Sequence, residues 1–224
     1  MKILCVSDNT DILIYSQNAP QRYKDVDLII SAGDLPLKYY DYMQTVLRKD
    51  VFYVYGNHNL EMFDEQMVNK VNMDTAPEYY GHLIDGKSYY DKYHDLIIVG
   101  LGGSGLYNNG KSQYTEGEMK GRMRKLFFRL LYNKIRYGRY MDILVTHAPV
   151  RGLGDGVDIC HRGFECFKGF LDRYNPKYML YGHVHLDDMN ARRHYEYNGV
   201  KLINIYKNYV LEDDNIRGGE IQCQ

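Results

Sequence analysis

The stretch "YMLYGHVH" (residues 178–185) combines a structural signal with a chemical one. Its first four residues form a short run of apolar and aromatic side chains, which is typical of a buried strand. A glycine ends the run, and two histidines follow, His183 and His185. Side chains two positions apart on extended backbone point to the same side, so the pair is either an edge of a metal site or fortuitous.

Similar short runs rich in Val, Ile and Leu recur along the chain and predict further strands. Because the runs are continuously apolar rather than alternating, we expect these strands to be covered on both faces. Segments 37–49 and 164–174 lie between them and have helical spacing. Strands that alternate with helices predict an α/β fold. The other runs are residues 2–7, 26–31, 51–55, 95–100, 142–146 and 201–206.

The length of 224 residues suits one large domain and is short for two. Since there is no linker-like tract and no repeat, we expect a single domain over residues 1–224 with a loop-helix insertion at about 102–140. The insertion contains a predicted helix, 115–137, which Thr115 and Glu118 could begin as a capping box.

The predicted helix 115–137 has two distinct faces. Its basic face is either a solvated surface or a surface beside the site that attracts anions or a partner. The apolar face consists of Met119, Met123, Leu126, Phe127, Leu130 and Leu131, and the basic face of Arg122, Lys125, Arg129 and Arg136.

The overall composition excludes several classes of protein. The formal net charge is −1, so no strong field favours nucleic acid or a membrane surface. The four cysteines have neither zinc-site nor disulfide spacing. The N-terminus enters strand-like sequence directly and no apolar run approaches membrane-spanning length, so we expect a cytoplasmic location and no membrane partner.

Asp, Asn and His, residue types that commonly bind metals, follow five of the predicted strands. The carboxyl ends of strands converge in an α/β sheet, so these side chains are expected to share one crevice. Gly33, Gly56 and Gly182 allow sharp exits from the strands there. His82, His94, His161 and His194 do not follow strands, and we expect them to be surface or structural residues. The strand-end residues are Asp8, Asp34, Asn57, His58, His147, His183 and His185.

The order of these motifs resembles the calcineurin-like metallophosphoesterase superfamily. Its signature runs Asp-x-His, Gly-Asp, Gly-Asn-His, a strand-end His and Gly-His-x-His. The resemblance implies a four-layer αββα sandwich of two mixed β-sheets flanked by helices, with two divalent metal ions at the strand ends. The matching segments are "SDNT" (7–10), "GDLP" (33–36), "GNHN" (56–59), "THAP" (146–149) and "GHVH" (182–185).

The resemblance also implies a role for each strand-end residue. Asp34 would bridge both ions, and Asp8 and His185 would bind the first ion. The second ion would be bound by Asn57, His147 and His183. His58 would face the substrate and protonate the leaving oxygen or stabilise the phosphoryl group.

The donor types agree with this assignment. Mixed carboxylate, amide and imidazole donors suit Mn²⁺, which we favour, or Fe, Ni²⁺, Co²⁺ or Zn²⁺, rather than a calcium or thiolate zinc site. Two such ions, about 3.5–4 Å apart, can share a hydroxide nucleophile and clamp an in-line displacement. The expected activity is therefore two-metal hydrolysis of a phosphodiester or a small phosphomonoester.

The first metal site departs from the signature. Thr10 stands where a histidine is expected, which removes a nitrogen donor, weakens the first site and favours harder ions such as Mn²⁺. The neighbouring Asp11 is an alternative donor. Asn59 stands where an acidic residue often follows Gly-Asn-His.

The substrate signals are weaker. Leu37 and Lys38 follow "GDLP" in place of the Asp-Arg-Gly sequence of phosphoprotein phosphatases, which disfavours phosphoprotein substrates. Arg151 and Arg162 are candidate phosphate contacts or plain surface residues. Two alternatives stay open: a non-catalytic scaffold on the same fold, which has no need of His58, and a nuclease, which the basic helix favours and the near-zero net charge disfavours.

Overall fold

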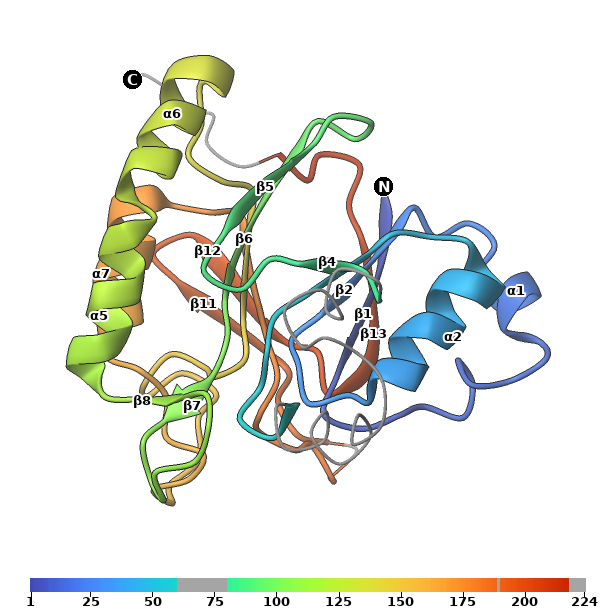
Figure 1. The fold of residues 1–224 in the computed structure, drawn as a ribbon, viewed down its shortest axis with the longest axis horizontal. Coiled ribbons are helices and arrows are strands. Elements are labelled where there is room, and N and C mark those ends of the chain that lie inside the picture. Colours follow the sequence, from blue (N-terminus) through green and yellow to red (C-terminus); the bar gives the residue numbers. More distant parts are fainter. Residues whose placement is uncertain (60–79, 189, 218–224) are drawn as a thin grey trace, which may run out of the picture.

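The computed structural model describes residues 1–59, 80–188 and 190–217. Two large mixed sheets pack face to face, and helices lie on their outer faces (Figure 1). This arrangement confirms the α/β sandwich that the sequence predicts.

The first sheet has the strand order β13-β1-β2-β3-β4. Strands β1 to β4 run parallel, and β13 pairs antiparallel with β1 at the edge. The strands are β1 Lys2–Ser7, β2 Leu28–Ser31, β3 Val51–Tyr53, β4 His82–Leu83 and β13 Lys207–Glu212.

The second sheet has the order β11-β12-β10-β9-β6-β5. Its four central strands are parallel, and the outer strands β5 and β11 pair antiparallel with their neighbours. The strands are β5 Ser88–Asp91, β6 Leu96–Leu101, β9 Ile143–Thr146, β10 Tyr178–Tyr181, β11 His194–Tyr197 and β12 Val200–Asn204.

Three apolar layers hold the sandwich together. The middle layer joins the facing sides of the two sheets, with Ile3 and Ile30 from one sheet and Ile98 and Leu180 from the other. The second layer packs α1 and α2 on the first sheet, and the third packs α5, α6 and α7 on the second. The helices are α1 Ala19–Arg22, α2 Leu37–Leu47, α5 Glu116–Lys125, α6 Phe127–Tyr137 and α7 Cys166–Tyr174.

Buried tyrosines form much of the layer beneath α2. Tyr39 and Tyr40 come from the helix, and Tyr53 comes from β3. The rings of Tyr40 and Tyr53 stack with their centroids 4.7 Å apart. The Tyr40 hydroxyl lies 3.0 Å from Ser31 Oγ, so the buried phenol keeps a hydrogen-bond partner. Burial raises the pKa of both Tyr39 and Tyr40.

The insertion contains a small sheet and a broken helix. Strands β7 (Ser104–Gly105) and β8 (Gln113–Tyr114) pair in parallel. The capping box of Thr115 and Glu118 is confirmed, but the single helix predicted over 115–137 is divided into α5 and α6. The division is at Leu126, whose N–H donates to the Met123 carbonyl at 3.1 Å. That the domain spans residues 1–224 stays a prediction.

Arg122 differs from its prediction as part of a solvated basic stripe. Its side chain is 17% exposed and pairs with Asp85 at 2.5 Å. It also donates to the Gly102 carbonyl at 2.7 Å and lies over the Tyr114 ring. Arg122 therefore fastens α5 to the sheet. Leu131, predicted on the apolar face, is 39% exposed.

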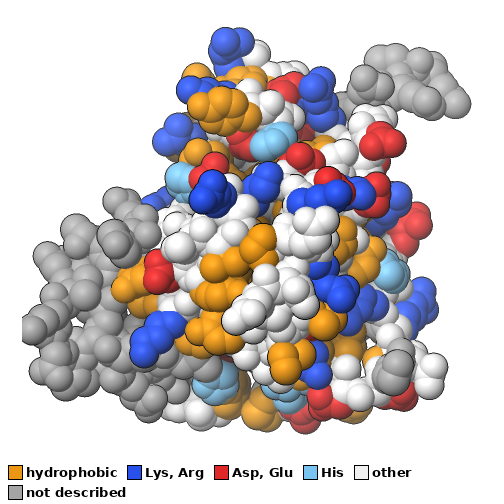
Figure 2. All heavy atoms as spheres, turned by 90° about the vertical axis from the view of Figure 1, so that its right-hand side faces the viewer, with side chains coloured by type: hydrophobic (Ala, Val, Ile, Leu, Met, Phe, Trp, Pro, Cys, Tyr) orange, Lys and Arg blue, Asp and Glu red, His pale blue; other side chains and the backbone are white. Residues whose placement is uncertain are grey.

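The surface carries both signs of charge. Figure 2, seen from the side of α1 and α2, shows basic and acidic side chains interspersed around a band of hydrophobic ones. This pattern agrees with the formal net charge of −1. Within the described residues, no helix is both long enough and apolar enough to cross a membrane.

Candidate metal centre

Three predicted ligands meet between the sheets. Donor atoms of Asp8, Asp34 and His147 all lie within 4.8 Å of one another. Asp8 follows β1 and Asp34 follows β2, whereas His147 follows β9 in the other sheet. We call these three residues the ligand cluster; it joins the carboxyl ends of both sheets.

Several backbone conformations around the cluster are unusual. Asp8, Asp34 and His183 have φ angles of 63°, 55° and 65°, in the left-handed region that few residues other than glycine adopt. Such conformations concentrate at functional sites. They bring main-chain donors to the carboxylates, since the His183 N–H lies 3.0 Å from both Asp8 oxygens.

Two glycines make room for the carboxylates. A Cβ at Gly56 would lie 2.1 Å from Asp34 Oδ1, and a Cβ at Gly182 would lie 2.4 Å from Asp8 Oδ2. Both distances are shorter than any real contact of a Cβ atom. The glycines predicted at these strand ends are therefore required by the packing of the cluster itself.

The hydrogen bonds of His147 define its tautomer. Its Nδ1 lies 2.8 Å from the Ala32 carbonyl, which can only accept, so Nδ1 carries a proton. Its Nε2 faces two oxygens, Asn57 Oδ1 at 3.0 Å and Asp34 Oδ2 at 3.2 Å. A neutral imidazole would present a lone pair to those oxygens, so the arrangement requires a proton or a cation between them.

The electrostatics of the cluster also indicate that a positive charge is needed between these side chains. Burial disfavours the charged ring of His147, but Asp34 and Asp8 outweigh it and raise its pKa to about 9. Burial opposes ionisation of Asp34 as well, yet His147 keeps the pKa of Asp34 below its usual value. Burial raises the pKa of Asp8 despite the neighbouring His147. Crowded carboxylates that hold a proton on an imidazole are a donor set that fits a divalent cation.

Asn57 and His58 lie at the same edge. The Asn57 amide nitrogen donates to the Tyr107 hydroxyl at 3.1 Å, which directs its oxygen towards His147. The main-chain N–H of His58 donates to Asp34 Oδ1 at 2.9 Å. The His58 residue itself is exposed, as a group that meets a substrate must be.

The backbone at His183 and His185 is not extended, which differs from the expectation for this pair. The left-handed φ of His183 turns the chain, so that His183 is buried and His185 is exposed. The His183 ring lies 4.8 Å from the His147 ring, whereas the His185 ring stacks on Tyr206 at 4.8 Å.

His183 is prepared to act as a donor. Its Nε2 donates to the Cys160 carbonyl at 2.7 Å, which leaves the Nδ1 lone pair free for a cation. Burial, followed by the nearby His147, lowers the pKa of His183 to about 3, so the ring is neutral.

Two contacts at the site carried no signal in the sequence. The Cys160 carbonyl acts through its main chain, which no residue pattern reveals. His161, expected to be a surface or structural residue, has its ring 5.2 Å from His183 and 6.3 Å from His185. A histidine that follows no strand gave no reason to expect it here.

Asn59 holds the two ligand loops together. Its side-chain oxygen accepts from the N–H groups of Asp34 and Gly56, both at 2.7 Å. Its amide nitrogen donates to the Leu35 carbonyl at 3.0 Å. The third bond needs a donor, so asparagine satisfies all three groups where a carboxylate would not.

The Asp11 carboxylate has hydrogen-bond partners of its own and is not part of the ligand cluster. One carboxylate oxygen accepts from the Leu13 N–H at 2.7 Å, and the other accepts from the Asn208 amide. Thr10 is exposed.

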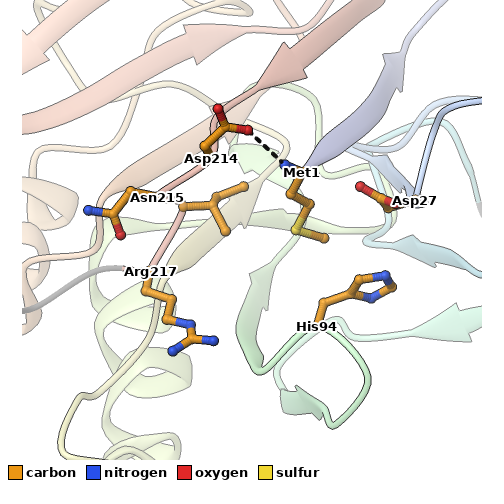
Figure 3. Close-up of a pocket in the computed structure, with 7 residues that line it drawn as sticks. Met1, Asp27, His94, Asp214, Asn215 and Arg217 are labelled. Atoms are coloured by element: carbon orange, nitrogen blue, oxygen red, sulfur yellow. Dashed lines mark ion pairs between the residues drawn. The ribbon is translucent and has the colours of Figure 1, made fainter.

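A different cavity lies at the opposite ends of the strands. It has a volume of about 430 Å³ and is lined by Met1, Asp27, His94 and Arg217, among others (Figure 3). Met1 precedes β1 and Asp27 precedes β2, so this cavity is at the amino ends of the strands. His94 Nδ1 is bound to Asp91 at 2.5 Å. The ligand cluster is thus separate from this cavity.

Comparison with known proteins agrees with this geometry. The sequence model of the calcineurin-like phosphoesterases matches residues 1–187. The chain belongs to this family. It is therefore a hydrolase that acts on phosphoester bonds, in a family whose members generally bind divalent metals.

The chain is also similar to solved structures, and the first of them shares the fold of this calcineurin-like phosphoesterase. TT1561 of Thermus thermophilus has a TM-score of 0.58 at 14% identity, over 92% of this chain and 88% of that one. A structure described as a novel archaeal phosphodiesterase has a TM-score of 0.45 at 16% identity, over 99% of both chains. No curated protein sequence matches the chain significantly.

Proposed function

We propose that the protein hydrolyses a phosphodiester or a small phosphomonoester with two divalent metal ions. The observation that carries this proposal is the convergence of Asp8, Asp34 and His147 within 4.8 Å, from both sheets of a calcineurin-like fold. Bound ions would neutralise the substrate phosphate and lower the pKa of an attacking water.

Several of the proposed ligands have a supporting contact. Asp34 would bridge the ions, because its oxygens face both His147 and the loop of Asn57 and His58. Asn57, His147 and His183 would bind the second ion. In each of the two histidines, one ring nitrogen already donates to a main-chain carbonyl, which leaves the other nitrogen for the metal. Asp8 and His185 would bind the first ion.

His58 would act on the leaving group. Its main chain is fixed to Asp34, while the residue is exposed at the edge of the cluster. A protonated imidazole can donate a proton to the leaving oxygen. A non-catalytic scaffold would not require this residue.

The two sites would be unequal. Thr10 supplies no imidazole and the Asp11 carboxylate is engaged, so the first ion would have fewer protein donors. We therefore propose that the second ion is retained through purification and the first exchanges. Mn²⁺ is the favoured first ion, because the donors that remain there are mainly oxygens.

The segment after Asp34 favours a small phosphoester over a phosphoprotein as the substrate. Leu37 begins α2, and Lys38 continues it in place of the phosphatase Arg-Gly sequence. A nuclease is less favoured than a small-substrate enzyme because Arg122, one of the four predicted basic residues, is paired with Asp85.

The test is a matrix of substrates and metals. Metal-depleted protein is assayed with bis(4-nitrophenyl) phosphate and 4-nitrophenyl phosphate after adding Mn²⁺, Fe²⁺, Ni²⁺, Co²⁺ or Zn²⁺. We expect hydrolysis only with metal, and Asp34→Asn should reduce binding of both ions whereas His147→Ala should reduce chiefly one. Activity that survives exhaustive chelation would overturn the metal mechanism.

A further inference from the structure

A second cavity lies beside the ligand cluster, between the insertion and the loop that follows β9. Its volume is about 260 Å³. Leu106 and Tyr114 line one side, and Ile159 and Arg162 line the other. Neither the family match nor the donor set explains this cavity.

Each wall of the cavity is adjacent in sequence to a residue that hydrogen-bonds a proposed ligand. Ile159 precedes Cys160, whose carbonyl accepts from His183. Leu106 precedes Tyr107, whose hydroxyl accepts from Asn57. Because consecutive Cα atoms are only about 3.8 Å apart, the cavity begins one residue from each of two groups that hydrogen-bond the proposed ligands His183 and Asn57. A substrate held at the cluster can extend into it.

The charge of the cavity is positive. Arg151 and Arg162 both line it, and neither forms an ion pair with a carboxylate of the described residues. The acidic group present, Glu116, accepts from the Glu165 N–H at 2.7 Å and the Cys166 N–H at 3.1 Å. Burial opposes its ionisation, but these bonds and Arg151 keep the pKa of Glu116 below its usual value.

Glu116 is thus used to cap α7 and is compensated there. Arg162 forms no ion pair within the described residues; the Asp155 carboxylate, close by in the chain, accepts from the Gly163 N–H at 3.2 Å. The cavity is therefore prepared for one further anion, with a guanidinium as its main contact.

The cavity is held in shape by the main chain. The Arg151 N–H donates to the Phe164 carbonyl at 3.2 Å, and the Phe164 N–H donates to the Pro149 carbonyl at 3.1 Å. The Tyr114 ring is fixed beneath the Arg122 guanidinium, 4.3 Å from its centroid. These contacts position the segments of both arginines before any ligand arrives.

The rim of the cavity is apolar. Leu106 is 40% exposed and Ile159 is 60% exposed. Together with the Tyr114 ring they offer a surface for an aromatic or apolar group. The combination of this rim and the Arg162 guanidinium fits a group that is both apolar and anionic.

We propose that this cavity binds the part of the substrate beyond the scissile phosphate, and that this part carries a second anionic group on an aromatic or apolar moiety. Arg162 is the main contact of that anion and Arg151 assists. The inference rests on the proposed function, since it places the cavity next to the bond that is cleaved.

The test compares two phosphodiesters that differ by one charge: 4-nitrophenyl phenyl phosphate and 4-nitrophenyl 4-carboxyphenyl phosphate. We expect the carboxylated diester to have a kcat/KM about tenfold higher, as one charge-assisted hydrogen bond provides. Arg162→Ala should lower kcat/KM for the carboxylated diester about tenfold and so remove the preference for it over 4-nitrophenyl phenyl phosphate. Arg129 is an exposed arginine on α6, so Arg129→Ala is the matched control and should leave kcat/KM for both diesters unchanged. Equal values for both diesters in the wild type would overturn the proposal.

Failure of the proposed function would be distinguishable. If no metal supports hydrolysis of either diester, binding of 4-carboxyphenyl phosphate is measured by calorimetry in the presence of chelator. The cavity proposal expects a Kd about tenfold weaker for Arg162→Ala than for the wild type. The same Kd in both proteins would overturn it, whatever the enzyme hydrolyses.

Discussion

His58 is the residue whose exposure and attachment separate chemistry from metal binding. Because its main chain is fixed to Asp34 and the residue is exposed, we expect His58→Asn to lower kcat by about 10²–10⁴-fold and to leave metal content unchanged. Steady-state kinetics and metal analysis of the same preparation provide the measurement. Loss of metal from the variant would instead make His58 a ligand.

Asn59 is the residue on which the shape of the cluster depends. Asn59→Ala removes three hydrogen bonds from buried main-chain groups, so it should lower the free energy of unfolding by about 3 kcal/mol. Urea denaturation measures this change. Asn18→Ala is the control, because Asn18 is exposed and its side chain makes no capping bond. Equal small losses in both variants would contradict the role given to Asn59.

At the scale of single residues, the sequence predicts which side chains lie together at the site, but not the backbone conformation and contacts of each one. Asp8, Asp34 and His147 could be predicted because each directly follows a continuous apolar run. The different burial of His183 and His185 could not, because it depends on one left-handed φ angle. The Cys160 carbonyl could not either, since a main-chain acceptor is present in every residue type.

Among the elements, α5 depends on one partly buried ion pair. Arg122→Met should lower the free energy of unfolding by about 2 kcal/mol, because it leaves Asp85 without its cation in a site where the carboxylate is only 11% exposed. Arg124→Met, on the same helix but exposed, should change it by less than about 0.5 kcal/mol. Urea denaturation of the two variants measures both changes in the free energy of unfolding. Similar losses in the free energy of unfolding for both variants would mean that Arg122 belongs to the solvated basic face.

The elements that the sequence predicts well are those covered on both sides. All seven predicted runs are strands, because continuous apolar sequence has few alternatives in an α/β fold. Edge strands such as β11, "HYEY", alternate in exposure and lack that signal. The break at Leu126 is also hidden, because residues on both sides of it keep helical periodicity.

At the scale of the whole molecule, the ligand cluster should act as a clamp. Asp8 and Asp34 belong to one sheet and His147 to the other, so an ion bound by all three links the halves of the sandwich. Removal of metal should lower Tm by about 5–10 °C, as expected for ligand present at about 100 times its Kd. Differential scanning fluorimetry with and without chelator measures the shift. Asp34→Asn should show little shift, and an unchanged Tm in the wild type would exclude a clamp.

The buried phenols beneath α2 give the protein an intrinsic optical signal. The chain has 24 tyrosines and no tryptophan, so phenol groups dominate its near-ultraviolet absorbance. The tyrosines of the unfolded chain ionise near about pH 10. Burial raises the pKa of Tyr55 to about 12 and that of Tyr40 further, so the fold retains protons that the unfolded chain loses.

Stability from these phenols is complete below about pH 10 and is lost as the pH rises towards their folded values. Alkaline titration should therefore show a gradual appearance of phenolate absorbance followed by a steep second step as the sandwich opens. A single gradual transition near pH 10 would mean that the phenols are not protected. Unfolding of this protein can thus be followed in the ultraviolet without any attached label.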